Sequence, residues 1–123
     1  YHIQYEFRYG LTEEKLREAY AESDIVYFAS TYEGFGLPIL EAMAIGRPVI
    51  TSDISPMKDI TLDNGIRVDP YNSGQVREAL QLLLTQPGQY TAYVERGLKH
   101  VKLYNADHIA NLYYQLYQRI LNE

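Results

Sequence analysis

The stretch that decides the fold is STYEGFGLPILEAMAIG at residues 30–46, where a glycine-rich turn leads into a short helix. The five residues before it, IVYFA at 25–29, are apolar without alternation, which is typical of a strand covered on both faces in a parallel sheet. Gly34 and Gly36 allow backbone turns that other residues resist. Pro38 fits the first position of a helix, and Gly46 fits the position just past its end. The stretch therefore predicts a strand, a turn and a two-turn helix.

The start of that helix is predicted to hold an anion. The first N–H groups, at residues 37–40, have no partner inside the helix, and the helix dipole adds positive potential there. A strand, a glycine turn and a helix in this order form a phosphate-binding unit.

Two glutamates make the prediction more specific than phosphate alone. Glu33 lies in the turn and Glu41 about one helical turn inside, so we expect them to be roughly 10 Å apart at ~1.5 Å per helical residue. Carboxylates repel phosphates but accept hydrogen bonds from hydroxyls. A ligand with a diphosphate in the middle and hydroxyl-rich groups at both ends, such as a nucleotide-sugar, meets all of these conditions.

The same residues carry a family resemblance. The string EGFGLPILE at 33–41, followed by AMAIGRPVITSD at 42–53, resembles the paired-glutamate motif of the group 1 glycosyltransferases. These are retaining enzymes built from two facing Rossmann-like domains, and the likeness covers most of the chain. The resemblance implies the donor-binding C-terminal domain of an enzyme that moves a hexose-type sugar from a nucleoside diphosphate sugar to a glycan, lipid or other acceptor.

The resemblance also implies roles for individual residues. Glu33 would be the catalytic residue that orients the transferred sugar, and Glu41 would hold the ribose hydroxyls of the nucleotide. The backbone amides between them would bind the donor sugar and the diphosphate: Gly34, Phe35, Gly36 and Leu37.

No metal or other cofactor is expected. The sequence has no Asp-x-Asp pair to hold a metal on a diphosphate, and the histidines lack ligand spacing. His2, His100 and His108 are expected to be surface or partly packed residues.

The chain departs from the family pattern in two places. It reads ISPMKD at 54–59 where the family often has Gly-Gly-x-Pro-Glu, so Asp59 is the candidate substitute for that glutamate. The basic pair that neutralises the diphosphate in the family is not matched by Arg8, Lys15 or Arg17. The expected partners are a nucleotide-sugar donor and an N-terminal acceptor-binding domain of the same protein, which these residues do not include.

Composition bounds the other functions. A chain of 123 residues and 14.2 kDa fits one domain, residues 1–123, with a core of its own. The net charge of −5 without a basic run argues against nucleic acid as a partner. We expect a cytoplasmic piece of a longer protein, because no secretory signal is visible and the sequence starts at Tyr1 without an initiator methionine. Membrane association of the longer protein is possible.

The remaining elements follow from periodicity and turn signals. Strands are predicted at residues 3–7, 25–29, 48–51 and 66–68, and a loop at 52–59. Helices are predicted at 12–22 with Thr12 as the cap, at 73–85, at 89–102 and at 107–122. This order predicts an α/β fold, a Rossmann-like parallel sheet with helices on both faces and the ligand at the carboxyl ends of the strands.

Two alternative functions stay open at this level. The same sheet could serve a noncatalytic regulatory module that binds a nucleotide. Asp53, directly after the strand at 48–51, could instead belong to the acidic pocket of a flavodoxin-like receiver domain. That alternative requires a second acidic site after an early strand and a lysine after a later strand, and neither stands out.

Overall fold

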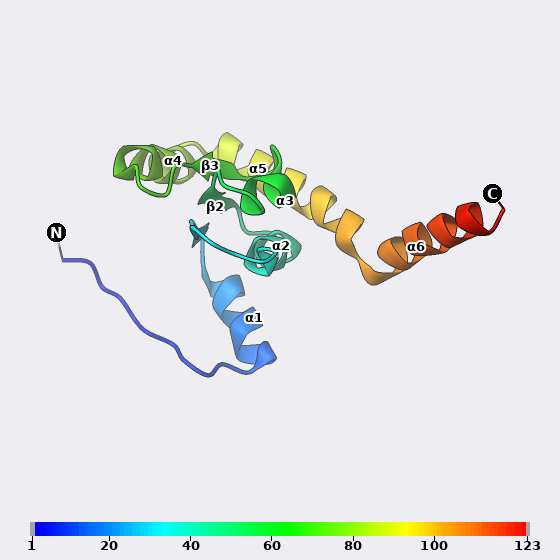
Figure 1. The fold of residues 1–123 in the computed structure, drawn as a ribbon. Coiled ribbons are helices and arrows are strands. Elements are labelled where there is room, and N and C mark those ends of the chain that lie inside the picture. Colours follow the sequence, from blue (N-terminus) through cyan, green and yellow to red (C-terminus); the bar gives the residue numbers. More distant parts are fainter. Residues whose placement is uncertain (1, 123) are drawn as a thin grey trace.

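The computed structural model describes residues 2–122, which form a small parallel sheet with helices on both of its faces (Figure 1). The strands are β1 (Val26–Phe28), β2 (Val49–Ser52) and β3 (Ile66–Val68). The helices are α1 (Glu13–Glu22), α2 (Leu37–Ala44), α3 (Met57–Thr61), α4 (Ser73–Thr85), α5 (Pro87–His100), the 3-10 helix η1 (Val101–Tyr104) and α6 (Ala106–Leu121).

The sheet has the order β1-β2-β3, and both strand pairs are parallel. Val49 lies opposite Val26 on one side of β2, and Ile50 lies opposite Ile66 on the other side. All four residues of β2 are buried, as expected for a central strand that helices cover on both faces.

Alternate residues of β2 enter two separate hydrophobic clusters. Val49 packs with residues of α2 and α3, including Ile39, Met43 and Met57, which are at most 1 % exposed. Ile50 packs on the opposite face with residues of β3 and α4 (Val68, Ala79 and Leu83). Helix α5 contacts both α2 and α4 and so links the helices of the two clusters. The predicted α/β architecture with both faces covered is confirmed.

Helix α1 begins where its capping residue predicts. The Thr12 side chain accepts a hydrogen bond from the Lys15 amide at 3.3 Å, and two glutamates, Glu13 and Glu14, occupy the first turn. Both features stabilise a helix N-terminus, because they satisfy free amides and complement the dipole.

The predicted strand at residues 3–7 is wrong. Residues 2–11 form neither helix nor strand, and Ile3 and Tyr5 are each 79 % exposed. An alternating pattern gives a segment strand propensity, but a strand also needs a neighbour to supply its hydrogen bonds. Within residues 2–122 no strand pairs with this segment, and the outer edge of β1 is unpaired.

The predicted loop at residues 52–59 contains the start of helix α3. Met57 and Ile60 turn inward from this helix and are 0 % and 5 % exposed. Burial of these two side chains against α2 stabilises a turn of helix where the local sequence indicates only polar and turn residues.

Helix α6 leaves the body of the molecule, as Figure 1 shows at the red end of the chain. It contacts mainly η1, and none of its described residues is buried. The predicted apolar stripe is therefore present on the helix but exposed. No helix among residues 2–122 is both long and apolar enough to cross a membrane.

Candidate functional site

The glycine turn lies at the carboxyl end of β1 and leads directly into α2. Gly36 caps α2 with φ of 93°, in the left-handed region, and its backbone is buried. A side chain at this position would be strained, and a Cβ would lie 3.3 Å from Cδ1 of Ile39. Gly34 has open space around it, since a Cβ there would meet no atom within 4 Å. The turn therefore needs glycine at 36 for its conformation, whereas Gly34 leaves room for a ligand.

Four consecutive backbone amides in this turn have no hydrogen-bond acceptor within residues 2–122. The amides of Gly34, Phe35, Gly36 and Leu37 donate no hydrogen bond to any residue that the structure describes. The anion site predicted at residues 37–40 has fewer free amides than expected. The Ile39 amide donates to the Gly36 carbonyl at 3.1 Å, and Pro38 has no N–H. The available donors thus come from the turn and the first helical residue.

The Phe35 side chain of the turn packs against a row of aromatic rings. Phe35 and Leu37 are 49 % and 55 % exposed. The rings of Phe35 and Tyr104 pack edge to face, with 6.4 Å between their centroids. The Tyr104 ring also packs on the His100 ring, with 5.3 Å between their centroids. His100 is 7 % exposed and its Nε2 lies 2.6 Å from the Ile60 carbonyl. His100 is therefore a buried structural residue, more enclosed than the surface or partly packed position that the sequence predicts.

The two glutamates have different surroundings. Glu33 is half-buried, and its carboxylate has no hydrogen bond to residues 2–122. Glu41, in the second turn of α2, accepts a hydrogen bond from the Tyr20 hydroxyl, with 2.9 Å between the oxygens. The distance between the two carboxylates stays a prediction.

Tyr20 is a site residue that the sequence did not reveal. Its place on the apolar stripe of α1 indicates a core residue, and its ring does pack against the cluster around Ile39 and Met43. Its hydroxyl reaches Glu41 only because the fold brings the end of α1 close to α2. Burial, reinforced by the hydrogen bond to Glu41, raises the pKa of Tyr20 above its ordinary value, so the hydroxyl stays protonated and acts as the donor.

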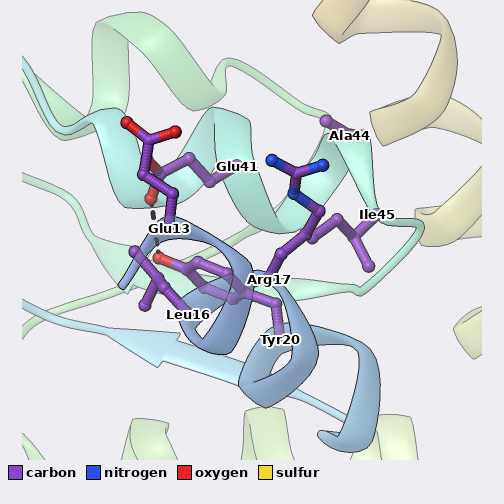
Figure 2. A pocket seen from close by; sticks show the side chains of 7 residues that line it. All are labelled: Glu13, Leu16, Arg17, Tyr20, Glu41, Ala44 and Ile45. Carbon is purple, nitrogen blue, oxygen red and sulfur yellow. Dashed lines mark hydrogen bonds between the residues drawn. The ribbon is translucent and has the colours of Figure 1, made fainter. Parts of the chain in front are cut away.

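A cavity of about 340 Å³ lies between α1 and α2 and reaches Glu41 (Figure 2). Its lining combines acidic, basic and apolar side chains: Glu13, Leu16, Arg17, Tyr20, Glu41, Ala44 and Ile45. Figure 2 shows the Tyr20 hydroxyl directed at the Glu41 carboxylate. Glu33 and the glycine turn do not line this cavity, so the structure joins Glu41 to α1 rather than to Glu33.

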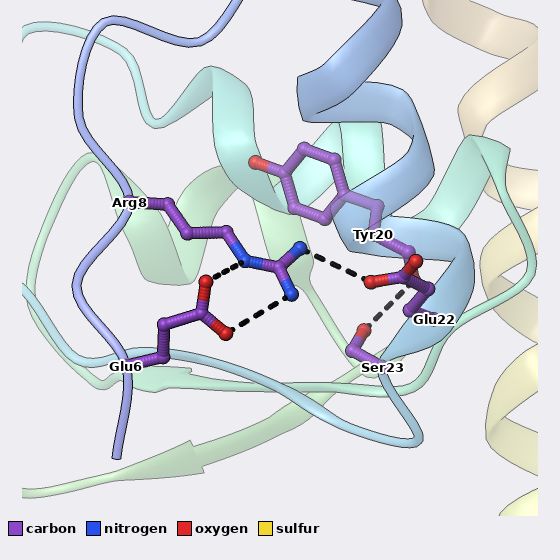
Figure 3. Close-up of polar contacts among 5 residues, drawn as sticks. All are labelled: Glu6, Arg8, Tyr20, Glu22 and Ser23. Atoms are coloured by element: carbon purple, nitrogen blue, oxygen red, sulfur yellow. Dashed lines mark hydrogen bonds and ion pairs between the residues drawn. The ribbon is translucent and has the colours of Figure 1, made fainter.

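Arg8, one of the three basic residues near the site in sequence, is held by carboxylates. Its guanidinium contacts Glu6 at 3.0 Å and Glu22 at 3.1 Å (Figure 3). The hydrogen bond to Glu6 and, to a smaller extent, the hydrogen bond to Glu22 raise the pKa of Arg8. Arg8 therefore uses its donors to tie the N-terminal segment to the end of α1, which agrees with its failure to match the basic pair of the family.

A second group of polar residues lies at the carboxyl ends of β2 and β3. A cavity of about 260 Å³ is lined there by Asp53, Ile54, Arg67, Asp69, Pro70 and Gln75. The Arg67 guanidinium lies 3.7 Å from the Asp53 carboxylate. Asp59, the candidate substitute for the family glutamate, is exposed and accepts a hydrogen bond from the Ser55 hydroxyl. Within residues 2–122 no three acidic or histidine side chains converge closely enough to hold a metal ion.

Comparison with known proteins gives consistent results. A sequence description of the family "Glycosyl transferases group 1" matches residues 3–100. The chain is 32 % identical over 93 residues to an O-antigen chain mannosyltransferase B of Escherichia coli, covering 76 % of this chain and 24 % of that protein.

Two solved structures have the same fold. A sucrose-phosphate synthase from Thermosynechococcus elongatus superposes with a TM-score of 0.77 and 30 % identity, over 91 % of this chain and 29 % of that one. The C-terminal domain of a glycosyl transferase group 1 family protein from Francisella tularensis superposes with a TM-score of 0.70 and 31 % identity, over 78 % of this chain and 50 % of that one. The chain thus spans half or less of each of these three proteins. Because the family description covers most of its residues, the chain belongs to the glycosyl transferases group 1 family.

Proposed function

We propose that this chain is the donor-binding half of a retaining glycosyltransferase that moves a hexose-type sugar from a nucleoside diphosphate sugar to a glycan, lipid or other acceptor. The observation that carries the proposal is the run of four amides without acceptors, Gly34 to Leu37, between Glu33 and Glu41. Backbone amides donate hydrogen bonds and can bind phosphate or hydroxyl oxygens. Ionised carboxylates only accept hydrogen bonds, so they bind hydroxyls rather than phosphates.

The proposed donor pose follows from this division. The diphosphate lies at the N-terminus of α2 against the Leu37 amide, and the sugar lies against the amides of Gly34, Phe35 and Gly36 with its hydroxyls on Glu33. The ribose lies toward Glu41. This pose places each charged or hydroxyl group of the donor against a group of complementary character.

In the transfer, the bond between the anomeric carbon and the diphosphate oxygen breaks, and a bond from that carbon to the acceptor oxygen forms. The acceptor hydroxyl passes its proton to the departing diphosphate oxygen, and the nucleoside diphosphate leaves with the electron pair of the broken bond. Fixed amides at the start of α2 stabilise the charge that develops on the leaving diphosphate. Glu33 keeps the anomeric carbon turned toward the acceptor, so the main contribution of this half is positioning.

We assign the acceptor site and the cations that neutralise the diphosphate to parts of a longer protein. This assignment is supported by the share of its relatives that the chain spans, 24 % of the mannosyltransferase and 29 % of the synthase. It is also supported by Arg8, whose guanidinium is already paired with two carboxylates.

The alternatives have less support. A noncatalytic nucleotide-binding module would use the same amides, and no feature of the site favours it over an enzyme. A receiver domain would need a cluster of acids around Asp53, but the Asp53 carboxylate lies 3.7 Å from the guanidinium of Arg67.

The test is turnover by the full-length protein with a panel of UDP-, GDP- and ADP-sugars, followed through release of the nucleoside diphosphate. The proposal expects release with one donor class and a loss of about 100-fold in turnover for Glu33→Gln, because a misplaced sugar loses its alignment with the acceptor. Glu78→Gln, on an exposed position of α4, is the matched control and should leave turnover unchanged. Nucleotide binding without turnover would favour the regulatory module, and no binding at all would overturn the proposal.

A further inference from the structure

Glu41 is held by a residue from another helix. The Tyr20 hydroxyl donates to Oε2 of Glu41 at 2.9 Å, and the two residues are 21 positions apart in the chain. Glu41 has three rotatable side-chain bonds, and on a short helix beside a cavity it has space to adopt several conformers. The hydrogen bond from Tyr20 selects one of them.

The hydrogen bond leaves Glu41 able to accept more. An ionised carboxylate has about four lone-pair sites, and Tyr20 occupies one of them, on Oε2. Among residues 2–122 no other group donates to this carboxylate. Oε1 and the rest of Oε2 are therefore available to hydroxyl groups of a ligand.

Tyr20 is itself fixed in place. Its ring packs on the cluster that includes Ile39 and Met43, and its backbone carbonyl accepts hydrogen bonds from the Ser23 hydroxyl at 2.8 Å and the Ser23 amide at 3.2 Å. The same end of α1 is tied by Glu22 to Arg8, as Figure 3 shows. The packing of the Tyr20 ring and the hydrogen bonds to its carbonyl thus fix the position of the donor hydroxyl.

We propose that Tyr20 is a positioning residue, whose hydroxyl orients the Glu41 carboxylate toward the ribose of the bound nucleoside diphosphate sugar. This inference rests on the proposed function, which places the ribose at Glu41. Tyr20 does not touch the ligand and acts only through the carboxylate. Two other charged side chains line the cavity beside Glu41. They are Glu13 and Arg17, and both come from α1.

The experiment compares a ribonucleotide with its 2′,3′-dideoxy analogue, which lacks the hydroxyls that Glu41 would bind. The chain is titrated with UDP, GDP and ADP by NMR, and the best ligand is then compared with its dideoxy form. The wild type should prefer the ribonucleotide by about 10-fold or more, as expected for hydrogen bonds to a charged group. Tyr20→Phe should bind the ribonucleotide about 3- to 10-fold more weakly and the dideoxy form with unchanged affinity.

Tyr90→Phe is the matched control. Tyr90 is also half-buried and its hydroxyl also donates a hydrogen bond, at 3.0 Å, but to the Asp24 carbonyl on the other side of the sheet from α2. This variant should keep the full preference for the ribonucleotide.

The outcomes separate the two claims. If the wild type does not prefer the ribonucleotide, the placement of the ribose in the proposed function fails. Suppose that the wild type prefers the ribonucleotide and that Tyr20→Phe keeps the same preference or binds both ligands more weakly by the same factor. The proposed function then stands, and the role of Tyr20 is overturned.

A second measurement needs no variant: in chain labelled with ¹³C-tyrosine, the ring signals of Tyr20 should shift with the ribonucleotide but not with the dideoxy form. Identical shifts with both ligands would also overturn the inference.

Discussion

Glu33 and Glu41 carry the same functional group in different settings, and this difference predicts different effects of the same substitution. Glu41 is bound by Tyr20, while Glu33 has no partner within residues 2–122. The sequence shows both glutamates and their spacing. It does not show that only one of them is held, because the holding residue lies 21 positions away on α1.

Glu41→Gln should weaken nucleoside diphosphate binding by about 1.5–3 kcal/mol, since a hydrogen bond to a charged group is lost. Glutamine keeps an oxygen that can accept from Tyr20, so the geometry should survive. Glu33→Gln should leave nucleoside diphosphate affinity unchanged, because Glu33 would bind the sugar alone. Calorimetry with the diphosphate checks both variants. Equal losses in the two variants would contradict the division of roles.

The glycines of the turn should also respond differently. Gly34→Val should block the approach of a ligand while the fold survives, because nothing lies within 4 Å of its Cβ position. We expect at least a tenfold loss of nucleotide-sugar affinity with the melting temperature unchanged, measured by titration and by thermal unfolding.

Gly36→Val is a poorer probe of the same idea. Its φ of 93° disfavours any side chain, so a loss of binding would be mixed with a loss of stability. Unchanged affinity in a well-folded Gly34→Val variant would place the ligand outside the turn.

At the scale of elements, the helix that carries Glu41 is positioned by close contact with α5. Gly97 of α5 lies against Met43 of α2, and a Cβ at Gly97 would be 3.0 Å from Cγ of Met43. Gly97→Val should therefore destabilise the fold by about 1–3 kcal/mol through overpacking. Gly88→Val, where the same helix has open space, should change the free energy of unfolding by no more than about 0.5 kcal/mol. Urea unfolding of the two variants checks this, and equal stabilities would mean that α2 and α5 are not closely packed.

Several elements could be predicted from the sequence because their signals are local. Thr12 marks the start of α1, the apolar run at 25–29 contains β1, and the turn before Ile66 marks β3. Other elements depend on partners. Helix α3 forms because Met57 and Ile60 reach the core, whereas the alternating residues 3–7 find no strand to pair with among the described residues.

The candidate site shows the same limit. Gly34, Gly36 and Pro38 predict the turn and the start of the helix, whereas the amides of the turn itself are expected only from the family resemblance. Tyr20 and Tyr104 could not be predicted, because the Tyr20 hydroxyl reaches Glu41 and the Tyr104 ring reaches Phe35 only in the folded chain. A tyrosine on an apolar stripe has the same pattern whether its hydroxyl is idle or bound.

At the scale of the whole molecule, the proposed function assigns the donor-binding surface to this chain and the acceptor site to another domain. With Arg8 paired to two carboxylates, the charge of a diphosphate is only partly offset, and we expect affinities of about 0.1–1 mM. Holding an acceptor against the anomeric carbon can lower a barrier by ~7–11 kcal/mol, and this contribution is assigned to another domain. The 123-residue chain should therefore release no nucleoside diphosphate from nucleotide-sugars at enzymatic rates in an assay with candidate acceptors. Release at such rates would place the acceptor site within this chain.

The most direct measurement of the central claim is an amide NMR map of nucleoside diphosphate binding to the chain. Titration with UDP, GDP and ADP should shift the amide signals of residues 34–37 and of Glu41 in a saturable manner with at least one of them. The amides around Asp53 and Asp69, at the second cavity, serve as the internal comparison and should move little. Saturable shifts confined to that second cavity, or no shift with any of the three nucleotides, would contradict the account.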